Sequence, residues 1–190
     1  MRVETADLAD VLVFRPEPFR DERGLFTRTF DARTFDDELS ARTAAGGGAV
    51  RAADFIQDSQ SRSALGVVRG LHGRSGRGEA KLVRCAHGAV HDVLVDIRRG
   101  SSTFGMQQSF TLDDVDFAHL YVPRGFLHGF QALTPTADVC YRIDREHDPA
   151  EDIAVAYDDP DLGIVWPLPV SLVSVRDAAA RGWAQLLESL

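Results

Sequence analysis

Short runs rich in Val, Leu and Phe follow one another along most of the chain, and Gly, Pro, Asp or Ser separates many of them. The runs cover residues 11–14, 25–30, 80–86, 89–97, 117–122 and 139–143. Closely spaced short strands with few helices are typical of a β-sandwich or barrel. Residues 91–96 alternate only weakly between polar and apolar side chains, which indicates a sheet partly covered on both faces. The pattern therefore predicts a mainly β protein.

Two helical segments are expected beside the strands. Asp31 can cap a helix that runs through Phe35 and Leu39. Residues 174–177, Ser-Val-Arg-Asp, have the form of a capping box before a second helix near the end of the chain. Residues 44–48, Ala-Ala-Gly-Gly-Gly, are expected to form a flexible loop. No repeat or shift in composition divides the 190 residues, so residues 1–190 are expected to form a single domain.

Charge and hydropathy argue against nucleic acid and membrane as partners of this chain. The net charge is −8 and no Lys/Arg-rich run is present, which argues against nucleic acid as a ligand. No apolar run approaches the ~20 residues of a membrane span. The first residues lack the pattern of a signal peptide, so a cytoplasmic location is expected. Cys85 and Cys140 lie in apolar runs and are expected to be reduced, buried thiols.

Two of the six histidines stand in contexts that favour chemistry. His72 ends the run VVRGLH and precedes a loop of Gly, Arg and Ser. His128 closes a P-x-G-x-x-H pattern, which resembles the second half of the motif of cupins, a class of small β-barrels. Metal cupins carry H-x-H and a Glu in the first half, whereas Gly73 and Arg74 follow His72 here. A metal-dependent cupin is therefore the less favoured interpretation.

Without a metal, the same residue types suit proton transfer beside a carbonyl group. A histidine such as His72 has an ordinary pKa of ~6.5 and can accept a proton near neutral pH. Lys81 and His128 can stabilise the oxygen of a developing enolate. A tyrosine across the pocket could return a proton to the other face. This set of groups describes an epimerase that acts on a carbon next to a ketone.

A series of ordered motifs resembles the dTDP-4-dehydrorhamnose 3,5-epimerase family. The motifs are DERGLF (21–26), VRGLH (68–72), AKLVR (80–84), DVLVDIR (92–98), STFG (102–105), VPRGFLHGF (122–130), DPDLGIVWP (159–167) and SVRD (174–177). Each motif alone is weak, but their common order and spacing make the resemblance specific. It implies a cupin-type jelly-roll β-barrel with a few short helices, a homodimer, and no metal or other cofactor.

The resemblance also implies a substrate and residue roles. The substrate is a nucleoside-diphosphate 4-keto-6-deoxyhexose, dTDP-linked in the family, which is inverted at C3 with or without C5. His72 is then the base, Asp177 its partner, Tyr141 the acid and Lys81 the residue that stabilises the enolate. The implied substrate-binding residues are Arg23, Phe26, Arg28, Gln57, Ser59, Arg69, Arg74 and His128, with Arg23 and Arg69 near the diphosphate. An Asp fixes the tautomer of its His, and a Tyr with an ordinary pKa of ~10 stays protonated.

Several positions depart from the family pattern. Arg28 stands where the family has a Glu near the nucleotide base, Ser59 replaces an Asn, and Arg74 replaces a Gln after R-G-L-H-x. Glu146 and His147 replace a Tyr-Tyr pair. These changes predict a variant sugar nucleotide, as in antibiotic-sugar rather than rhamnose biosynthesis. Two alternatives stay open: a 3-monoepimerase, and a non-catalytic cupin that binds a nucleotide sugar without proton exchange.

Overall fold

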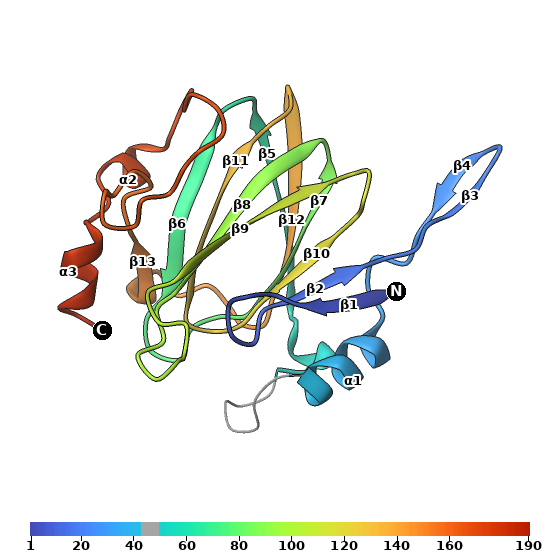
Figure 1. The fold of residues 1–190 in the computed structure, drawn as a ribbon, viewed down its shortest axis with the longest axis horizontal. Coiled ribbons are helices and arrows are strands. Elements are labelled where there is room, and N and C mark those ends of the chain that lie inside the picture. The colour runs from blue at the N-terminus through green and yellow to red at the C-terminus, as the bar shows by residue number, and fades with distance from the viewer. Residues whose placement is uncertain (43–49) are drawn as a thin grey trace.

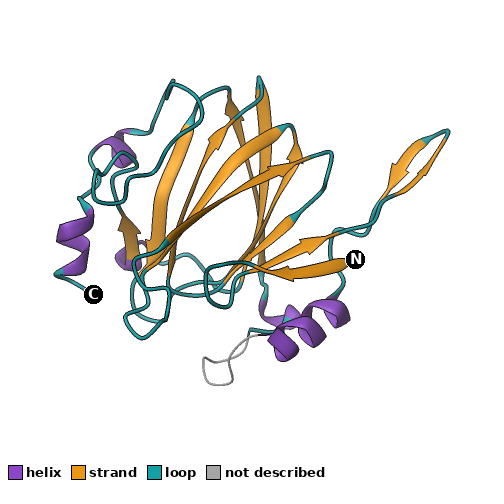
Figure 2. Ribbon diagram, in the orientation of Figure 1, coloured by secondary structure: helices purple, strands orange, loops and turns teal. Residues whose placement is uncertain are grey.

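The computed structural model describes residues 1–42 and 50–190, and two antiparallel sheets face each other in it (Figures 1 and 2). Sheet 1 has the strand order β1-β2-β10-β7-β12-β5, and sheet 2 has the order β13-β6-β11-β8-β9. The mainly β, jelly-roll prediction is confirmed, although hydrogen bonds between described strands do not close the two sheets into a continuous barrel. The loop expected at residues 44–48 lies outside the described residues.

The described strands and helices have the following bounds. The strands are β1 (Arg2–Thr5), β2 (Leu12–Arg15), β3 (Phe19–Asp21), β4 (Gly24–Phe26), β5 (Gln57–Ala64), β6 (Val68–Arg74), β7 (Lys81–His87), β8 (Ala89–Asp96), β9 (Gln107–Asp113), β10 (His119–Val122), β11 (Phe126–Ala132), β12 (Thr136–Ile143) and β13 (Asp152–Ala154). The helices are α1 (Ala32–Arg42), α2 (Val175–Ala178) and α3 (Trp183–Leu187), with 3₁₀ turns η1 (Ala52–Asp54) and η2 (Pro149–Glu151).

Apolar side chains fill the space between the sheets and also cover parts of their outer faces. Leu94 and Phe130 belong to a buried cluster shared by both sheets. Val95, next to Leu94 on β8, instead packs in a cluster with Trp183 of α3. Successive residues of β8 are therefore buried on opposite faces. This arrangement confirms that weak alternation in residues 91–96 reflects a sheet covered on both sides.

Helix α1 begins as its capping residue predicts. The Asp31 carboxylate accepts a hydrogen bond from the Thr34 N–H at 3.0 Å, and the Asp31 carbonyl accepts one from Phe35 at 2.9 Å. Phe35 and Leu39, one turn apart, are buried against the outer face of sheet 1. The spacing of these two residues thus sets the face of α1 that packs.

The C-terminal helix is divided in two, which differs from the single helix predicted after residues 174–177. Helix α2 ends at Ala178, and Arg181 forms a parallel bridge with Val155. Helix α3 starts at Trp183, after Gly182 in an extended conformation. The bridge to Val155 requires extended backbone at Arg181, so a continuous helix cannot form there.

The hairpin of β3 and β4 projects away from both sheets (Figure 1). Phe19 and Phe26 face each other across it, and their exposed fractions are 68% and 74%. The strand expected at residues 25–30 ends at Phe26, because the following residues leave the hairpin toward α1. A two-stranded hairpin is marginally stable alone in water, so these exposed rings are a feature that needs explanation.

Two smaller expectations can be compared with the structure. Cys85 and Cys140 are buried free thiols, as predicted, and burial raises the pKa of Cys85 to about 12. Among the residues that the structure describes, no helix combines the length and the apolar character needed to cross a membrane.

Candidate active site

A cavity of about 650 Å³ opens between the two sheets. Most of the residues singled out from the sequence line it, although they come from distant parts of the chain. They are Gln57, Ser59, Arg69, His72, Arg74, Lys81, His128, Tyr141 and Asp177. The fold therefore brings the predicted base, acid, lysine and second histidine around one space.

His72 and Asp177 form a tight pair at one wall of this cavity. His72 lies on β6, and its Nε2 is 2.6 Å from Asp177 Oδ1 on α2. The Ser174 hydroxyl accepts a hydrogen bond from the Asp177 N–H at 3.0 Å, which is one half of the predicted capping box. The Asp177 carboxylate instead turns to His72 and to the Gly70 N–H. The short helix α2 thus positions a buried carboxylate behind the histidine.

Two glycines allow β6 and β11 to approach closely beside this pair. Gly70 has a φ of +124°, and a Cβ there would lie 2.5 Å from the Gly129 Cα. A Cβ on Gly129 would meet the Leu71 side chain at 2.8 Å. The pairing of β6 with β11 also shifts register just after His128, which lies directly opposite His72. The glycines of the RGLH and HGF motifs therefore set the position of both histidines.

The surroundings of His72 affect its pKa in two opposite directions. Burial lowers the pKa of His72 below its ordinary value, and Asp177 partly offsets that effect, while Lys81 and Arg176 add to it. The imidazole is then neutral near neutral pH and can accept a proton. If Nε2–H donates to Asp177, Nδ1 is the nitrogen that carries the free electron pair.

Tyr141 stands on the opposite sheet from His72. It lies on β12 of sheet 1, whereas His72 belongs to sheet 2. The Tyr141 hydroxyl is 3.0 Å from the Ser61 hydroxyl. Burial raises the pKa of Tyr141, so the phenol stays protonated at neutral pH. A proton acceptor and a proton donor therefore face one cavity from different sheets.

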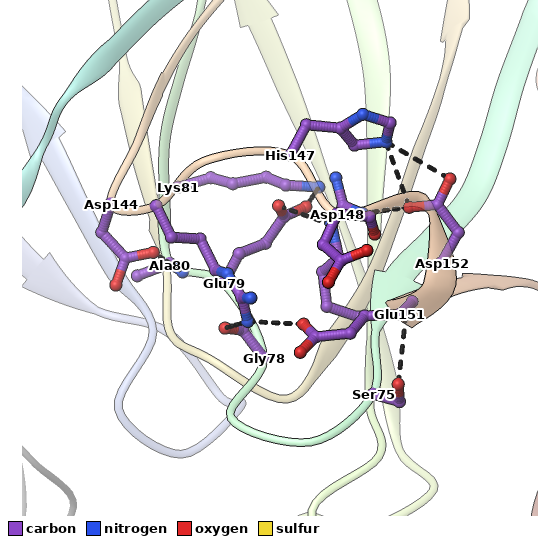
Figure 3. Close-up of polar contacts among 12 residues, drawn as sticks. Ser75, Gly78, Glu79, Ala80, Lys81, Asp144, His147, Asp148, Glu151 and Asp152 are labelled. Atoms are coloured by element: carbon purple, nitrogen blue, oxygen red, sulfur yellow. Dashed lines mark hydrogen bonds and ion pairs between the residues drawn. The ribbon is translucent and has the colours of Figure 1, made fainter.

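Lys81 reaches the cavity from β7 and is paired with Glu79. Its Nζ lies 3.0 Å from Glu79 Oε1, and Arg74 Nε donates to Glu79 Oε2 at 2.9 Å. Arg74 also binds Asp152, which in turn pairs with Arg176. Figure 3 shows the Lys81 side chain extended toward Glu79, and His147 joined to Asp152.

His128 is buried at the cavity and held by a carboxylate. Its Nε2 lies 2.7 Å from Asp92 Oδ2, and both side chains are almost completely buried. The ring centroid of His128 is 6.2 Å from that of Tyr141, in a T-shaped arrangement. Asp92 therefore fixes the orientation of the His128 ring. In the described parts of the chain, His, Cys, Asp and Glu side chains form no group of three or more that could hold a metal ion.

Three of the predicted substrate-binding residues lie away from the cavity of their own chain. Arg23 and Phe26 belong to the projecting hairpin, and Arg28 follows it. Arg23 pairs with Asp21 at 2.6 Å, and Arg28 pairs with Asp31 at 2.8 Å. Within one chain, the structure does not bring these three side chains to the other site residues.

Arg74 lines the cavity, and its guanidinium is bound to carboxylates of the protein. Its Nε binds Glu79, and its Nη1 binds Asp152 and the Asp148 carbonyl. Only 9% of the side chain is exposed. Arg74 is therefore part of the cavity wall, with its Nε and Nη1 donors bound to other groups of the protein.

The sequence patterns missed Ser61, Glu79 and Arg176, which also line the cavity. Ser61 follows Gln57 and Ser59 at intervals of two residues on β5, so strand periodicity would have placed it on the same face. Arg176 lies within the SVRD motif, but nothing in the motif indicates its direction. Glu79 precedes Lys81 by two residues, outside the expected strand.

Comparisons with known proteins agree with this arrangement. The family model described as dTDP-4-dehydrorhamnose 3,5-epimerase matches residues 5–185. A relative of that name from Shigella flexneri is 35% identical over 93% of both chains. Another from Neisseria gonorrhoeae is 38% identical over 98% of this chain, which spans only 54% of that relative. A dTDP-4-dehydrorhamnose 3-epimerase from Streptomyces niveus is 37% identical over 95% of this chain and 83% of its own.

Solved structures give the same relationship. NovW, a 4-keto-6-deoxy sugar epimerase from the novobiocin gene cluster of Streptomyces spheroides, has a TM-score of 0.90 and 35% identity, covering 100% of this chain and 90% of its own. ChmJ, a 3'-monoepimerase from Streptomyces bikiniensis in complex with dTDP-quinovose, has a TM-score of 0.83 and 30% identity. The match covers 97% of this chain and 89% of ChmJ. The motifs, the fold and these matches together place the chain in the dTDP-4-dehydrorhamnose 3,5-epimerase family.

Proposed function

We propose that this protein inverts C3 of a nucleoside-diphosphate 4-keto-6-deoxyhexose, with dTDP as the nucleotide carrier. One observation supports the proposal above the others. His72, paired with Asp177, and Tyr141 lie on different sheets and face the same cavity. Inversion at carbon requires removal of a proton from one face of the sugar and return of a proton to the other. A base and an acid on opposite walls meet that requirement.

In the proposed first step, His72 removes the proton from C3. The electron pair of the C–H bond forms the C3–C4 double bond, and the electrons of the C4 carbonyl move to its oxygen. Lys81 stabilises this enolate oxygen from the cavity wall with its ammonium group. His128 adds a donor through Nδ1–H, which requires a proton on both ring nitrogens because Nε2 is bound to Asp92. Asp177 stabilises the imidazolium that forms on His72.

In the second step, the enolate collapses to the ketone and C3 takes the proton of the Tyr141 hydroxyl. The new proton enters from the face opposite His72, so the configuration at C3 is inverted. The tyrosinate then recovers a proton and His72 releases one, both by exchange with solvent. Each turnover therefore exchanges the C3 hydrogen for a solvent hydrogen.

Relatives named as 3,5-epimerases and as 3-epimerases share C3 as a site of inversion. Inversion at C5 would use the same residues if the ring can turn to present C5 to His72. The family thus supports action at C3, whereas the pathway, rhamnose-like or antibiotic-sugar, depends on the product. A cytoplasmic location of the reaction is part of this proposal.

We further propose that two copies form a homodimer through the projecting β3–β4 hairpin. The hairpin projects from the two larger sheets, and its residues Phe19 and Phe26 are mostly exposed. Burying these rings against a second copy would remove apolar surface from water. It would also offer a role for Arg23 and Arg28, which do not reach the cavity of their own chain.

The proposed reaction can be tested by NMR of dTDP-4-keto-6-deoxyglucose in D₂O with a catalytic amount of protein. We expect the C3 proton signal to disappear, and a parallel loss at C5 would identify a 3,5-epimerase. His72→Ala should abolish exchange at C3. Ligand-induced stabilisation of the protein without any exchange, across several 4-keto sugar nucleotides, would instead identify a non-catalytic binding protein.

A further inference from the structure

Lys81 has an unusual place in this chain. Among 21 Lys and Arg residues it is the only lysine, and only 8% of it is exposed. Its ammonium group lies 3.0 Å from Glu79 Oε1 at the cavity wall (Figure 3). A lysine has a long and flexible side chain, so a cation that stabilises an enolate must be held in place before the charge develops.

Glu79 is built to hold two cations at once. One carboxylate oxygen pairs with Lys81 and the other with Arg74, and only 9% of the Glu79 side chain is exposed. Burial acts to raise the pKa of Glu79, but Lys81 and Arg74 together hold it below its ordinary value. The carboxylate is therefore ionised at neutral pH, and each of its two oxygens has a cationic partner.

A carboxylate next to Lys81 creates an electrostatic problem for the proposed reaction. Alone, Glu79 would neutralise Lys81 and weaken the attraction between the ammonium group and the enolate oxygen. Arg74 supplies the compensating charge, and Asp152 together with the Asp148 carbonyl holds Arg74 in the wall. The sequence Lys81, Glu79, Arg74, Asp152, Arg176 alternates in sign and carries one net positive charge.

We propose that Glu79 and Arg74 are positioning residues for Lys81: Glu79 fixes the ammonium group, and Arg74 offsets Glu79 so that Lys81 keeps its charge for the enolate. This inference rests on the proposed function. It also gives a reason why Arg74, which replaces the Gln expected from the family pattern, is bound to Glu79. The two residues act as one unit, and neither touches the reacting atoms.

The unit predicts a specific pattern of kinetics in a double-mutant cycle. Glu79→Gln keeps the shape but leaves Lys81 and Arg74 as like charges without a shared carboxylate. It should lower kcat about tenfold to a hundredfold with little change in KM. Arg74→Gln leaves Glu79 to neutralise Lys81 and should lower kcat about tenfold. The double variant again has one uncompensated cation, so it should be faster than Glu79→Gln alone.

The single lysine also allows a measurement that needs no substrate. Protein labelled with ¹⁵N and ¹³C in lysine gives one side-chain ammonium signal, from Lys81. We expect a slowly exchanging ammonium signal, shifted from that of free lysine, in the unmutated protein. In Glu79→Gln it should broaden and move toward the free-lysine position. Glu38→Gln removes a comparable ion pair, with Arg42 on α1, far from the cavity and should leave the signal unchanged.

These outcomes separate the inference from the reaction it serves. An ammonium signal like that of free lysine in the unmutated protein would overturn the positioning role, even if variants fail to fold. If the loss of kcat in the double variant equals the product of the losses in the two single variants, Glu79 and Arg74 act independently. That result would also overturn the positioning role. If the unmutated protein exchanges no substrate proton, the proposed reaction fails, while the lysine signal still decides whether Glu79 holds Lys81.

Discussion

The basicity of His72 depends on two neighbours with opposite effects. Burial lowers its pKa and Asp177 partly restores it. In Asp177→Asn the carboxylate charge is lost, so the pKa of His72 should fall further. The acidic limb of the pH–rate profile should then move to lower pH, because the imidazole loses its proton at a lower pH. The maximal rate should fall at least about a hundredfold, because the imidazolium loses its counter-charge.

The profile of C3 exchange against pH, measured by NMR in D₂O, checks this prediction. An unchanged or upward shift of the acidic limb in Asp177→Asn would contradict the pairing. Asp159→Asn, at a carboxylate that accepts from the Trp183 N–H outside the cavity, serves as a control for a general change in charge.

Tyr141 is expected to act after the carbon–hydrogen bond has broken. Tyr141→Phe removes the hydroxyl but keeps the ring against His128. Inversion should slow about a hundredfold or more, while exchange of the C3 hydrogen with solvent should fall much less. NMR can follow both in one sample, and Tyr157→Phe provides the same change at a tyrosine outside the cavity. Equal losses in exchange and inversion would contradict an acid role.

At the scale of strands, β6 and β11 approach each other closely beside the cavity. Gly129→Ala would place a methyl group 2.8 Å from the Leu71 side chain and 2.9 Å from the Arg69 carbonyl. We expect a loss of about 1–3 kcal/mol in the free energy of unfolding, because backbone atoms would have to move. Activity should also fall, since His128 is the preceding residue. Urea denaturation measures the first effect.

Gly100→Ala is the matched control for this substitution. A Cβ at Gly100 meets no atom within 4 Å, so the free energy of unfolding should stay within about 0.5 kcal/mol of the unmutated value. Equal stability of the two variants would show that β6 and β11 separate easily, and would contradict a role for the glycines in fixing His72 and His128.

The buried His119 on β10 makes the stability of the protein sensitive to pH. Burial, with a further contribution from Arg84 and Arg142, lowers its pKa to about 3. Between pH 6.5 and 3 the unfolded chain binds a proton here that the folded chain does not. The free energy of unfolding therefore falls as pH falls, by up to about 1.4 kcal/mol per pH unit from this group.

His119→Leu removes that proton-binding site and should flatten the decline. Urea denaturation of both proteins between pH 7 and pH 4.5 measures the difference in slope. Parallel slopes would contradict a buried neutral histidine at this position. His87, which is mostly exposed, is the control: His87→Leu should leave the slope unchanged.

Strand β5 shows why some elements escaped prediction. Its sequence, QDSQSRSA, contains no large apolar residue. One face lines the cavity with Gln57, Ser59 and Ser61, and the strand lies at the edge of sheet 1. A strand without an apolar face gives no hydrophobic period to detect. Strands β7, β8 and β12 were predicted because they contribute apolar residues to the core between the sheets.

For the whole molecule, the hairpin leads to a prediction about assembly. If Phe19 and Phe26 pack against a second copy, replacing both with Ser should weaken the dimer at least about tenfold in dissociation constant. Sedimentation at several concentrations measures this constant. Val165 is an apolar residue outside the hairpin that is 81% exposed, and Val165→Ser should leave the dissociation constant unchanged. A monomeric unmutated protein would contradict the proposed dimer.

The family resemblance identified nine of the residues that line the cavity, but not how they are connected. Motif order predicted that His72, Lys81, His128, Tyr141 and Asp177 share one site, and all five line the cavity. The direction of Arg74 was beyond sequence reasoning, because it depends on Glu79 and Asp152 coming together from separate segments. Hydrogen-bond partners are set by tertiary packing, which a single sequence does not display.

The proposed acid, Tyr141, and the proposed base, His72, lie on separate sheets, and this has a consequence for which sugars can react. Packed sheets are about 10 Å apart, so a ring that touches both walls must fit a fixed thickness. Phe130 lines the cavity and also belongs to the buried cluster between the sheets, together with Leu94. We therefore expect the volume of Phe130, and of residues such as Leu94 in the same cluster, to limit the thickness of the sugar. Substitutions in this cluster should change substrate preference while every polar group stays in place.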